Sequence, residues 1–286
     1  MHLPHFLKTT AIVFAASGLA SGPGLAQEGS PLGYETHGSG TEKVIVLHDW
    51  LGSSATWDPI KPYLDTDEFT YVFTHVRGYG TSQDRKGNYT TGEITSDVFA
   101  LADALGFDRF HLIGHSMTGM AGFNAISAEG SDRIQSFVAV TPTPPGGYPA
   151  DEQTRQFFAA IPHDEKMTQA AFDGLTSGRY GPSWAEVKTR RNLASSTEEA
   201  MRGYGAMVYE DLSERLVDAA PQTPTRVIAG AHDLPDMKPD ALRKTTVPLV
   251  PNAELVIIEG AGHYPMDETP ILLVKLIEAH LKANTG

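Results

Sequence analysis

Three residues of this chain have the side chains that nucleophilic catalysis requires, and each follows a different short apolar run. Ser116 follows FHLIGH (110–115), Asp233 comes soon after TRVIAG (225–230), and His263 follows ELVIIE (254–259). An imidazole within hydrogen-bond reach can take the proton of a serine hydroxyl, and a carboxylate on the other ring nitrogen fixes its tautomer. These residue types, in this order, favour a serine-based acyl transfer.

The segment around Ser116 nearly matches Gly-x-Ser-x-Gly, a tight strand-to-helix turn that carries a serine at its tip. Gly114 occupies the first position, but the fifth is Thr118, and a glycine comes one residue later at Gly119. The alternative is a serine in an ordinary turn, and the motif alone does not decide between the two.

A developing oxyanion needs preorganised hydrogen-bond donors, each worth about 3 kcal/mol. The backbone amide of Met117 directly follows the serine, where the start of a helix favours negative charge. The amide of Trp50 lies in the loop after the apolar run KVIVLH (43–48). We therefore predict Trp50 and Met117 as the oxyanion donors.

The pattern of apolar runs indicates the elements that would bring these residues together. Most of the runs are continuously apolar, which is typical of strands buried on both faces of a parallel sheet. Between them lie amphipathic helical stretches such as 93–106 and 269–283. This alternation predicts an α/β fold with a mostly parallel, doubly wound sheet. The six predicted strands are 43–48, 70–75, 110–115, 135–141, 225–230 and 254–259.

The alternation stops between residues 143 and 221, where a Pro/Gly-rich stretch is followed by helical fragments only. We interpret 143–221 as a helical cap, inserted between the sixth and seventh core strands of a core formed by 27–142 and 222–286. Because open α/β sheets bind ligands at the carboxyl ends of their strands, such a cap would cover the site. The alternative is an insertion that only buries sheet surface.

Over residues 32–286 the chain resembles the α/β-hydrolase fold family, in particular its capped esterases, lactonases and cofactor-free haloperoxidase-like perhydrolases. The resemblance rests on HDWLGSSATWD (48–58), THVRGYGTS (74–82), GHSMTG (114–119) and GAGHYPMDETP (260–270). It implies Ser116 as nucleophile, Asp233 as acid, His263 as base, and oxyanion amides from Trp50 and Met117.

Three positions depart from the pattern of that family. Asp49 stands where glycine is usual, His75 where aspartate is usual, and Thr118 where a small residue is usual. We expect Thr118 to face the packing beneath the turn.

Trp50, His115 and Tyr264 are the residues that we predict to line the substrate pocket. Several histidines and acidic residues follow the strands, but their spacing matches no metal-binding helix motif. No metal and no cofactor are therefore predicted.

The overall charge and the N-terminus narrow the choice of partners and location. The net charge of −13 disfavours nucleic acid and anionic membranes as partners. The absence of cysteine removes disulfides and thiolate metal sites. Residues 1–26 have the charged, apolar and small-residue regions of a secretory signal. We expect cleavage near Ala26–Gln27 and a periplasmic or extracellular product.

These observations predict a secreted serine hydrolase that cleaves a small or medium carboxylic ester or lactone through an acyl-enzyme. Hydrolysis of a carbon–carbon bond in a diketone and perhydrolysis use the same three residues and remain alternatives. A non-catalytic ligand-binding protein on the same fold is a further alternative. The resemblance disfavours an epoxide hydrolase or a haloalkane dehalogenase, because their relatives use aspartate at the position of Ser116.

Overall fold

The computed structural model describes residues 30–286, so the predicted signal peptide lies outside the described residues. Its centre is a seven-stranded sheet in the order β1-β3-β2-β4-β5-β6-β7, parallel except for β1, which runs antiparallel to β3. This confirms the predicted α/β fold. The strands are β1 (Gly33–His37), β2 (Glu42–Leu47), β3 (Phe69–His75), β4 (Phe110–His115), β5 (Ile134–Val140), β6 (Thr225–Gly230) and β7 (Ala253–Ile258).

All six predicted strands are present, and β1 is an additional strand that the sequence analysis missed. Every residue of β4 and β5 is buried, as their apolar runs indicated. The sequence of β1, GYETH, has no such run, and its residues are mostly half-buried at the edge of the sheet. Backbone pairing with β3, rather than side-chain burial, therefore places this strand.

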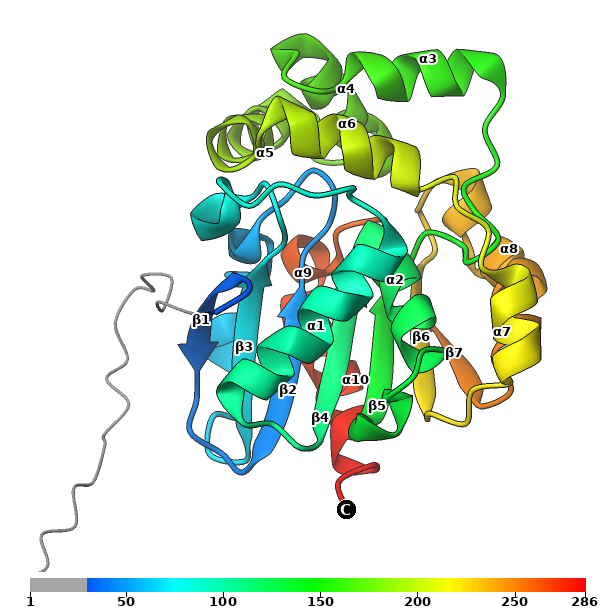
Figure 1. The fold of residues 1–286 in the computed structure, drawn as a ribbon. Coiled ribbons are helices and arrows are strands. Elements are labelled where there is room, and N and C mark those ends of the chain that lie inside the picture. Colours follow the sequence, from blue (N-terminus) through cyan, green and yellow to red (C-terminus); the bar gives the residue numbers. More distant parts are fainter. Residues whose placement is uncertain (1–29) are drawn as a thin grey trace, which may run out of the picture.

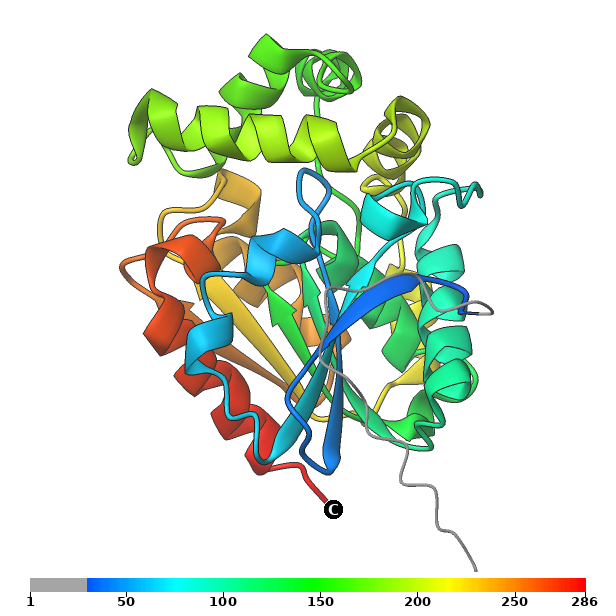
Figure 2. The ribbon, with the colours of Figure 1, turned by 90° about the vertical axis from the view of Figure 1, so that its left-hand side faces the viewer.

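Helices cover both faces of the sheet (Figures 1 and 2). Helices α1 and α2 lie on one face, and α10 lies on the other. Thr90 accepts a hydrogen bond from the Glu93 amide at the start of α1, and Gly106, with a φ of 68°, ends it. The core helices are α1 (Thr91–Leu105), α2 (Met117–Ile126), α8 (Pro239–Thr245), α9 (Pro265–Glu268) and α10 (Pro270–Lys282).

The insertion joins β5 to β6 and contributes five further helices. Figure 1 shows α3 to α6 above the sheet, on the side where the strand-end loops lie, whereas α7 lies lower, at the side of the sheet where β6 and β7 lie. The helices are α3 (Glu152–Ala160), α4 (Glu165–Leu175), α5 (Gly181–Ser195), α6 (Glu198–Met207) and α7 (Ser213–Ala219).

The position of the insertion in the strand order needs a correction. It follows the fifth strand of the sheet, not the sixth as predicted. The reason is that the described residues before β2 form only one strand, β1.

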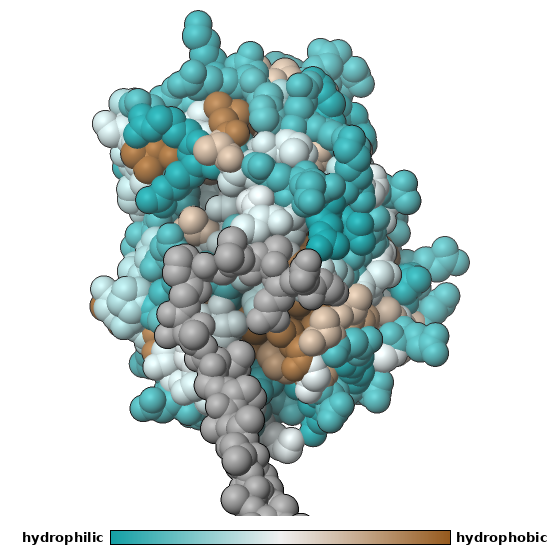
Figure 3. All heavy atoms as spheres, turned by 60° about the vertical axis from the view of Figure 1, so that its left-hand side comes forward, coloured by the Kyte–Doolittle hydropathy of each residue, from teal (hydrophilic) through white to brown (hydrophobic). Residues whose placement is uncertain are grey.

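The surface in Figure 3, outside the part that grey atoms cover, is mainly hydrophilic, with apolar side chains in small separate groups. This agrees with the strongly negative net charge. Of the helices in residues 30–286, none combines the length and the apolar character that crossing a bilayer requires.

Candidate active site

Ser116 occupies a strained turn between β4 and α2. Its backbone has a φ of 56° and a ψ of −116°, a conformation that residues other than glycine rarely adopt. Gly114 makes the turn possible, since a Cβ there would lie 2.4 Å from the carbonyl oxygen of Thr118. The side chain of Ser116 lines a cavity under the insertion.

Thr118, the departure from the motif, closes this turn from the inside. Its hydroxyl accepts the amide of His115 at 2.9 Å and donates to the carbonyl of the same residue at 3.0 Å. Thr118 is fully buried and does not line the cavity. The threonine therefore supports the turn beneath Ser116, as expected.

Thr118→Val should lower the free energy of unfolding by about 1–3 kcal/mol, because the buried His115 amide loses its acceptor while the side-chain volume is kept. Chemical denaturation measures this change. Ser127→Ala is the control, since that hydroxyl bonds the Asn124 carbonyl at the half-buried end of the same helix, and it should change stability by less. A Thr118→Val variant as stable as the wild type would contradict the proposed support.

Asp233 and His263 come together at the ends of β6 and β7. The Nδ1 atom of His263 lies 3.0 Å from both carboxylate oxygens of Asp233, and both side chains are buried. Burial lowers the pKa of His263, but the Asp233 carboxylate, with a smaller contribution from Asp49, holds this pKa above its usual value. Because His263 and Ser116 line the same cavity, the structure brings all three predicted residues to one place.

Activity that uses His263 as a base should fall as the pH drops, because the base must be neutral. The raised pKa places the midpoint of this fall above 6.5. Asp49→Asn should move the midpoint to lower pH, since it removes an anion that favours the imidazolium. The measurement is kcat/KM against pH in the wild type and in Asp49→Asn. A flat wild-type profile from pH 5 to 8 would contradict the role of His263 as the base.

Of the two predicted oxyanion donors, Met117 directly follows Ser116, and Trp50 lines the same cavity as Ser116. Met117 begins α2, so its amide is at the positive end of the helix. The Trp50 carbonyl accepts the hydroxyl of Tyr79 at 2.7 Å, and its indole nitrogen donates to the Met201 carbonyl in α6 at 2.8 Å. Tyr79 is a contributor that sequence reasoning missed, and the insertion thus contacts the predicted oxyanion loop directly.

The cavity beside Ser116 has a volume of about 270 Å³ and a mainly apolar wall. Trp50 and Tyr264 line it. Three aromatic residues of the insertion, Tyr148, Phe157 and Phe158, line it too. The sequence could not indicate this, because helical periodicity does not distinguish residues that line a cavity from residues of the core. The other lining residues are Asp49, Leu51, Thr143, Thr154, Ile161, Ala170, Ala171, Gly174, Leu175, Val208, Leu234 and Met237.

The assignment of His115 to the pocket is corrected, because His115 is fully buried and does not line the cavity. It precedes Ser116 at the end of β4, where neighbouring side chains point in opposite directions. Its Nε2 donates to the carbonyl of His263 at 2.8 Å, and its Nδ1 lies 3.5 Å from Asp49. His115 therefore supports the loop of His263 from behind.

Asp49, which replaces the usual glycine, is a buried anion with several partners. Its carboxylate accepts the hydroxyl groups of Thr56 at 2.9 Å and Tyr264 at 2.8 Å. Burial raises the pKa of Asp49, but the contact with His115 and the nearby Lys188 outweigh it and hold the pKa well below its usual value. Asp49 is therefore ionised, and it is one of the residues that line the cavity.

Two further histidines connect the strand-end loops. His48 donates from Nδ1 to the carbonyl of Asp49 at 2.8 Å and accepts the amide of Val76 at Nε2. Burial lowers the pKa of His48 to about 4, so it is neutral, as this pairing requires. His75 accepts the amide of Thr81 where the family usually has aspartate. Within residues 30–286, no three His, Asp or Glu side chains lie together so that they could hold a metal ion.

Residues 43–270 match the model of the alpha/beta hydrolase fold family. A similar protein is the putative carbamate hydrolase RutD of Pseudomonas savastanoi, 25% identical over 257 residues that cover 85% of this chain and 95% of that protein.

Solved structures also resemble this fold. Bromoperoxidase from Bacillus anthracis has a TM-score of 0.79 at 22% identity, and the match covers 91% of this chain and 99% of that protein. The enol-lactonase from Burkholderia xenovorans has a TM-score of 0.76 at 22% identity, covering 91% and 100%. Because the family model matches most of the chain, the chain belongs to the α/β-hydrolase family.

Proposed function

We propose that the protein is a serine hydrolase that cleaves a small or medium, uncharged carboxylic ester or lactone. The observation that carries this proposal is Ser116, held on a strained turn in the cavity that it shares with His263, whose Nδ1 lies 3.0 Å from both oxygens of Asp233. The family membership supports hydrolysis, and the serine supports an acyl-enzyme.

In the first half of the reaction, His263 Nε2 takes the hydroxyl proton of Ser116 while Oγ bonds to the carbonyl carbon of the ester. The carbonyl oxygen becomes an oxyanion that the amides of Met117 and Trp50 stabilise. The imidazolium, balanced by Asp233, then gives the proton to the leaving alkoxide oxygen as the carbon–oxygen bond breaks. Water repeats the sequence on the acyl-enzyme and releases the carboxylic acid and free Ser116.

The cavity wall supports an uncharged substrate. Among the described residues that line it, there is no lysine and no arginine that could pair with a substrate carboxylate. The lining does include Asp49, whose carboxylate is ionised. A second negative charge placed near Asp49 in this apolar surrounding is repelled, and the repulsion is stronger than it would be in water.

The proposal is tested with p-nitrophenyl esters of neutral acids from acetate to octanoate, the anionic p-nitrophenyl hemisuccinate, lactones and aryl diketones. Neutral esters or lactones should be hydrolysed, and kcat/KM for hemisuccinate should be at least about tenfold lower than for butyrate. Turnover of diketones alone, or preference for hemisuccinate, would contradict the proposed substrate class.

We also propose that the protein is exported and that residues 1–26 are removed. The n-, h- and c-like regions of the N-terminal sequence support this. N-terminal sequencing of the protein from the native host should find Gln27, and a start at Met1 would contradict it.

A further inference from the structure

Glu268 is a buried carboxylate that none of the steps above uses. It ends α9, five residues after His263, and its side chain is fully shielded from solvent. Its Oε2 accepts the amide of Gly262 at 2.7 Å, and its Oε1 accepts the amide of Tyr264 at 3.0 Å. One carboxylate therefore fixes the backbone on both sides of His263.

The amide of His263 itself is held by the insertion. It donates to the carbonyl of Leu175, the last residue of α4, at 3.3 Å. Three consecutive amides of the histidine loop thus have fixed acceptors, two from Glu268 and one from the insertion. The position of the imidazole depends on both.

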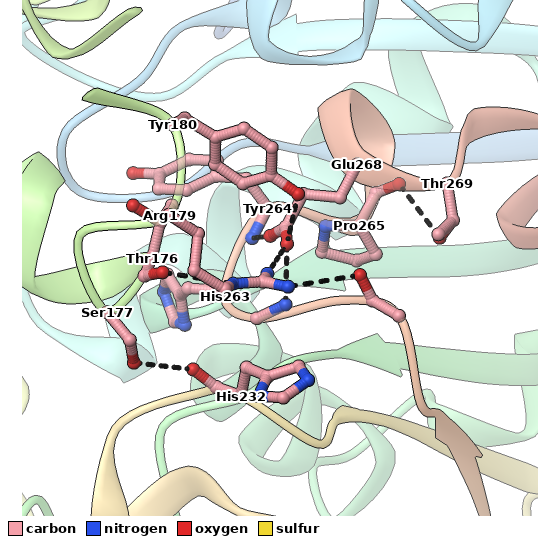
Figure 4. Close-up of polar contacts among 12 residues, drawn as sticks. Thr176, Ser177, Arg179, Tyr180, His232, His263, Tyr264, Pro265, Glu268 and Thr269 are labelled. Atoms are coloured by element: carbon pink, nitrogen blue, oxygen red, sulfur yellow. Dashed lines mark hydrogen bonds and ion pairs between the residues drawn. The ribbon is translucent and has the colours of Figure 1, made fainter. Parts of the chain in front are cut away.

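The turn between α4 and α5 also reaches Glu268, as Figure 4 shows. The Arg179 guanidinium forms an ion pair with the Glu268 carboxylate, and the hydroxyl of Tyr180 donates to it at 3.0 Å. Arg179 donates in addition to the carbonyl of Gly260 at 3.2 Å and to that of Thr176 at 3.1 Å. Arg179 therefore joins the turn to the histidine loop while it neutralises the buried charge.

The same turn contacts the loop that carries Asp233. The hydroxyl of Ser177 donates to the carbonyl of His232 at 3.0 Å (Figure 4). Gly262 lies between the two loops, since a Cβ there would be 3.1 Å from the His232 carbonyl oxygen and 3.2 Å from Arg179 Nη2. Residues 176–180, the docking turn, thus bridge the loops of the predicted acid and base.

We propose that Glu268 and Arg179 are positioning residues for His263, so that the imidazole is held against Asp233 only while the docking turn is in place. Neither side chain lines the cavity, so both act through the backbone of the histidine loop. This inference rests on the proposed function, in which His263 is the base. It implies that opening of the insertion would also release the base.

The test uses Glu268→Gln and Arg179→Gln in the full chain. Glutamine keeps the shape of Glu268 but presents a donor to one of the two amides, and Arg179→Gln removes the ion pair. We expect kcat to fall by about 10- to 100-fold in each variant with KM within about threefold, because a small displacement of the base is costly while the cavity is unchanged. Arg179→Lys should recover part of the loss.

A second readout reports the position of His263 without substrate. The proton between His263 Nδ1 and Asp233 should give a low-field NMR resonance in the wild type, and it should weaken or shift upfield in both glutamine variants. The groups that face the His263 ring are Asp233, Asp49, His115 and Tyr264, and none of them is changed. A general loss of stability would not by itself move this resonance.

Glu198→Gln is the matched control, because it makes the same substitution in another Glu–Arg ion pair, the one with Arg202 on the exposed face of α6. It should leave kcat and the resonance unchanged. Glutamine variants that melt earlier but keep wild-type kcat and resonance would overturn the inference. If Glu268→Gln does not fold, Arg179→Gln tests the inference by the same two measurements, kcat and the resonance, because Arg179 is partly exposed.

The two proposals fail in different ways. A wild-type protein that hydrolyses no ester or lactone contradicts the proposed function, whereas the resonance still decides whether Glu268 and Arg179 position His263. A wild type whose activity depends on Ser116, with both glutamine variants unchanged, contradicts the positioning role alone.

Discussion

Ser116→Ala is expected to lower kcat/KM for the preferred ester by about 10³-fold or more, because members of a catalytic triad act as a unit. Alanine removes the hydroxyl at the tip of the strand-to-helix turn. The Ser116 side chain makes no capping hydrogen bond in α2, so the variant should unfold at nearly the wild-type temperature. Steady-state kinetics and thermal unfolding measure the two effects.

Ser127→Ala provides the matched control, since this serine lies at the other end of α2 and its hydroxyl bonds a backbone carbonyl. It should keep wild-type activity. If the Ser116 variant retains hydrolysis within about tenfold of the wild type, the reaction does not pass through an acyl-enzyme at this residue.

Asp233→Asn should lower kcat by about 10³- to 10⁴-fold while it leaves the fold intact. The amide of Leu234 donates to Oδ1 at 2.7 Å, so the asparagine oxygen is retained at that position. Its NH2 group then occupies the place of Oδ2, 3.0 Å from His263 Nδ1, and opposes the proton there. The NH2 group therefore disfavours the tautomer with a proton on Nδ1, which the reaction needs, and the charge that stabilises the imidazolium is lost.

The neighbouring Asp236→Asn serves as a comparison, because it makes the same chemical change in the same loop without contact to His263. We expect kcat within about twofold of the wild type. Equal losses in the two variants would indicate that the loop, rather than the Asp233–His263 pair, is responsible.

The sequence predicted the parts of the site that depend on strand ends. Apolar runs located six strands, and parallel strands bring their carboxyl ends to one edge, so Ser116, Asp233 and His263 could be expected to meet. The sequence also predicts Thr118 beneath the turn, where its hydroxyl accepts the amide of His115.

The parts that sequence did not predict depend on contacts across the fold. β1 has no apolar run and is placed by pairing with β3. His115 turns away from the cavity because strand side chains alternate, and its histidine-loop contact spans 148 positions. The pairing of Arg179 with Glu268, 89 positions apart, has no local pattern at all.

The central claim, that Ser116 is a nucleophile activated by His263, is tested most directly by reaction with a serine-directed fluorophosphonate followed by peptide mass mapping. A serine hydroxyl is reactive enough to be labelled only where a base removes its proton. We predict one adduct per chain, on Ser116, formed more slowly in Asp233→Asn and absent in Ser116→Ala. An adduct on another residue, or no adduct in a protein that hydrolyses esters, would contradict the account.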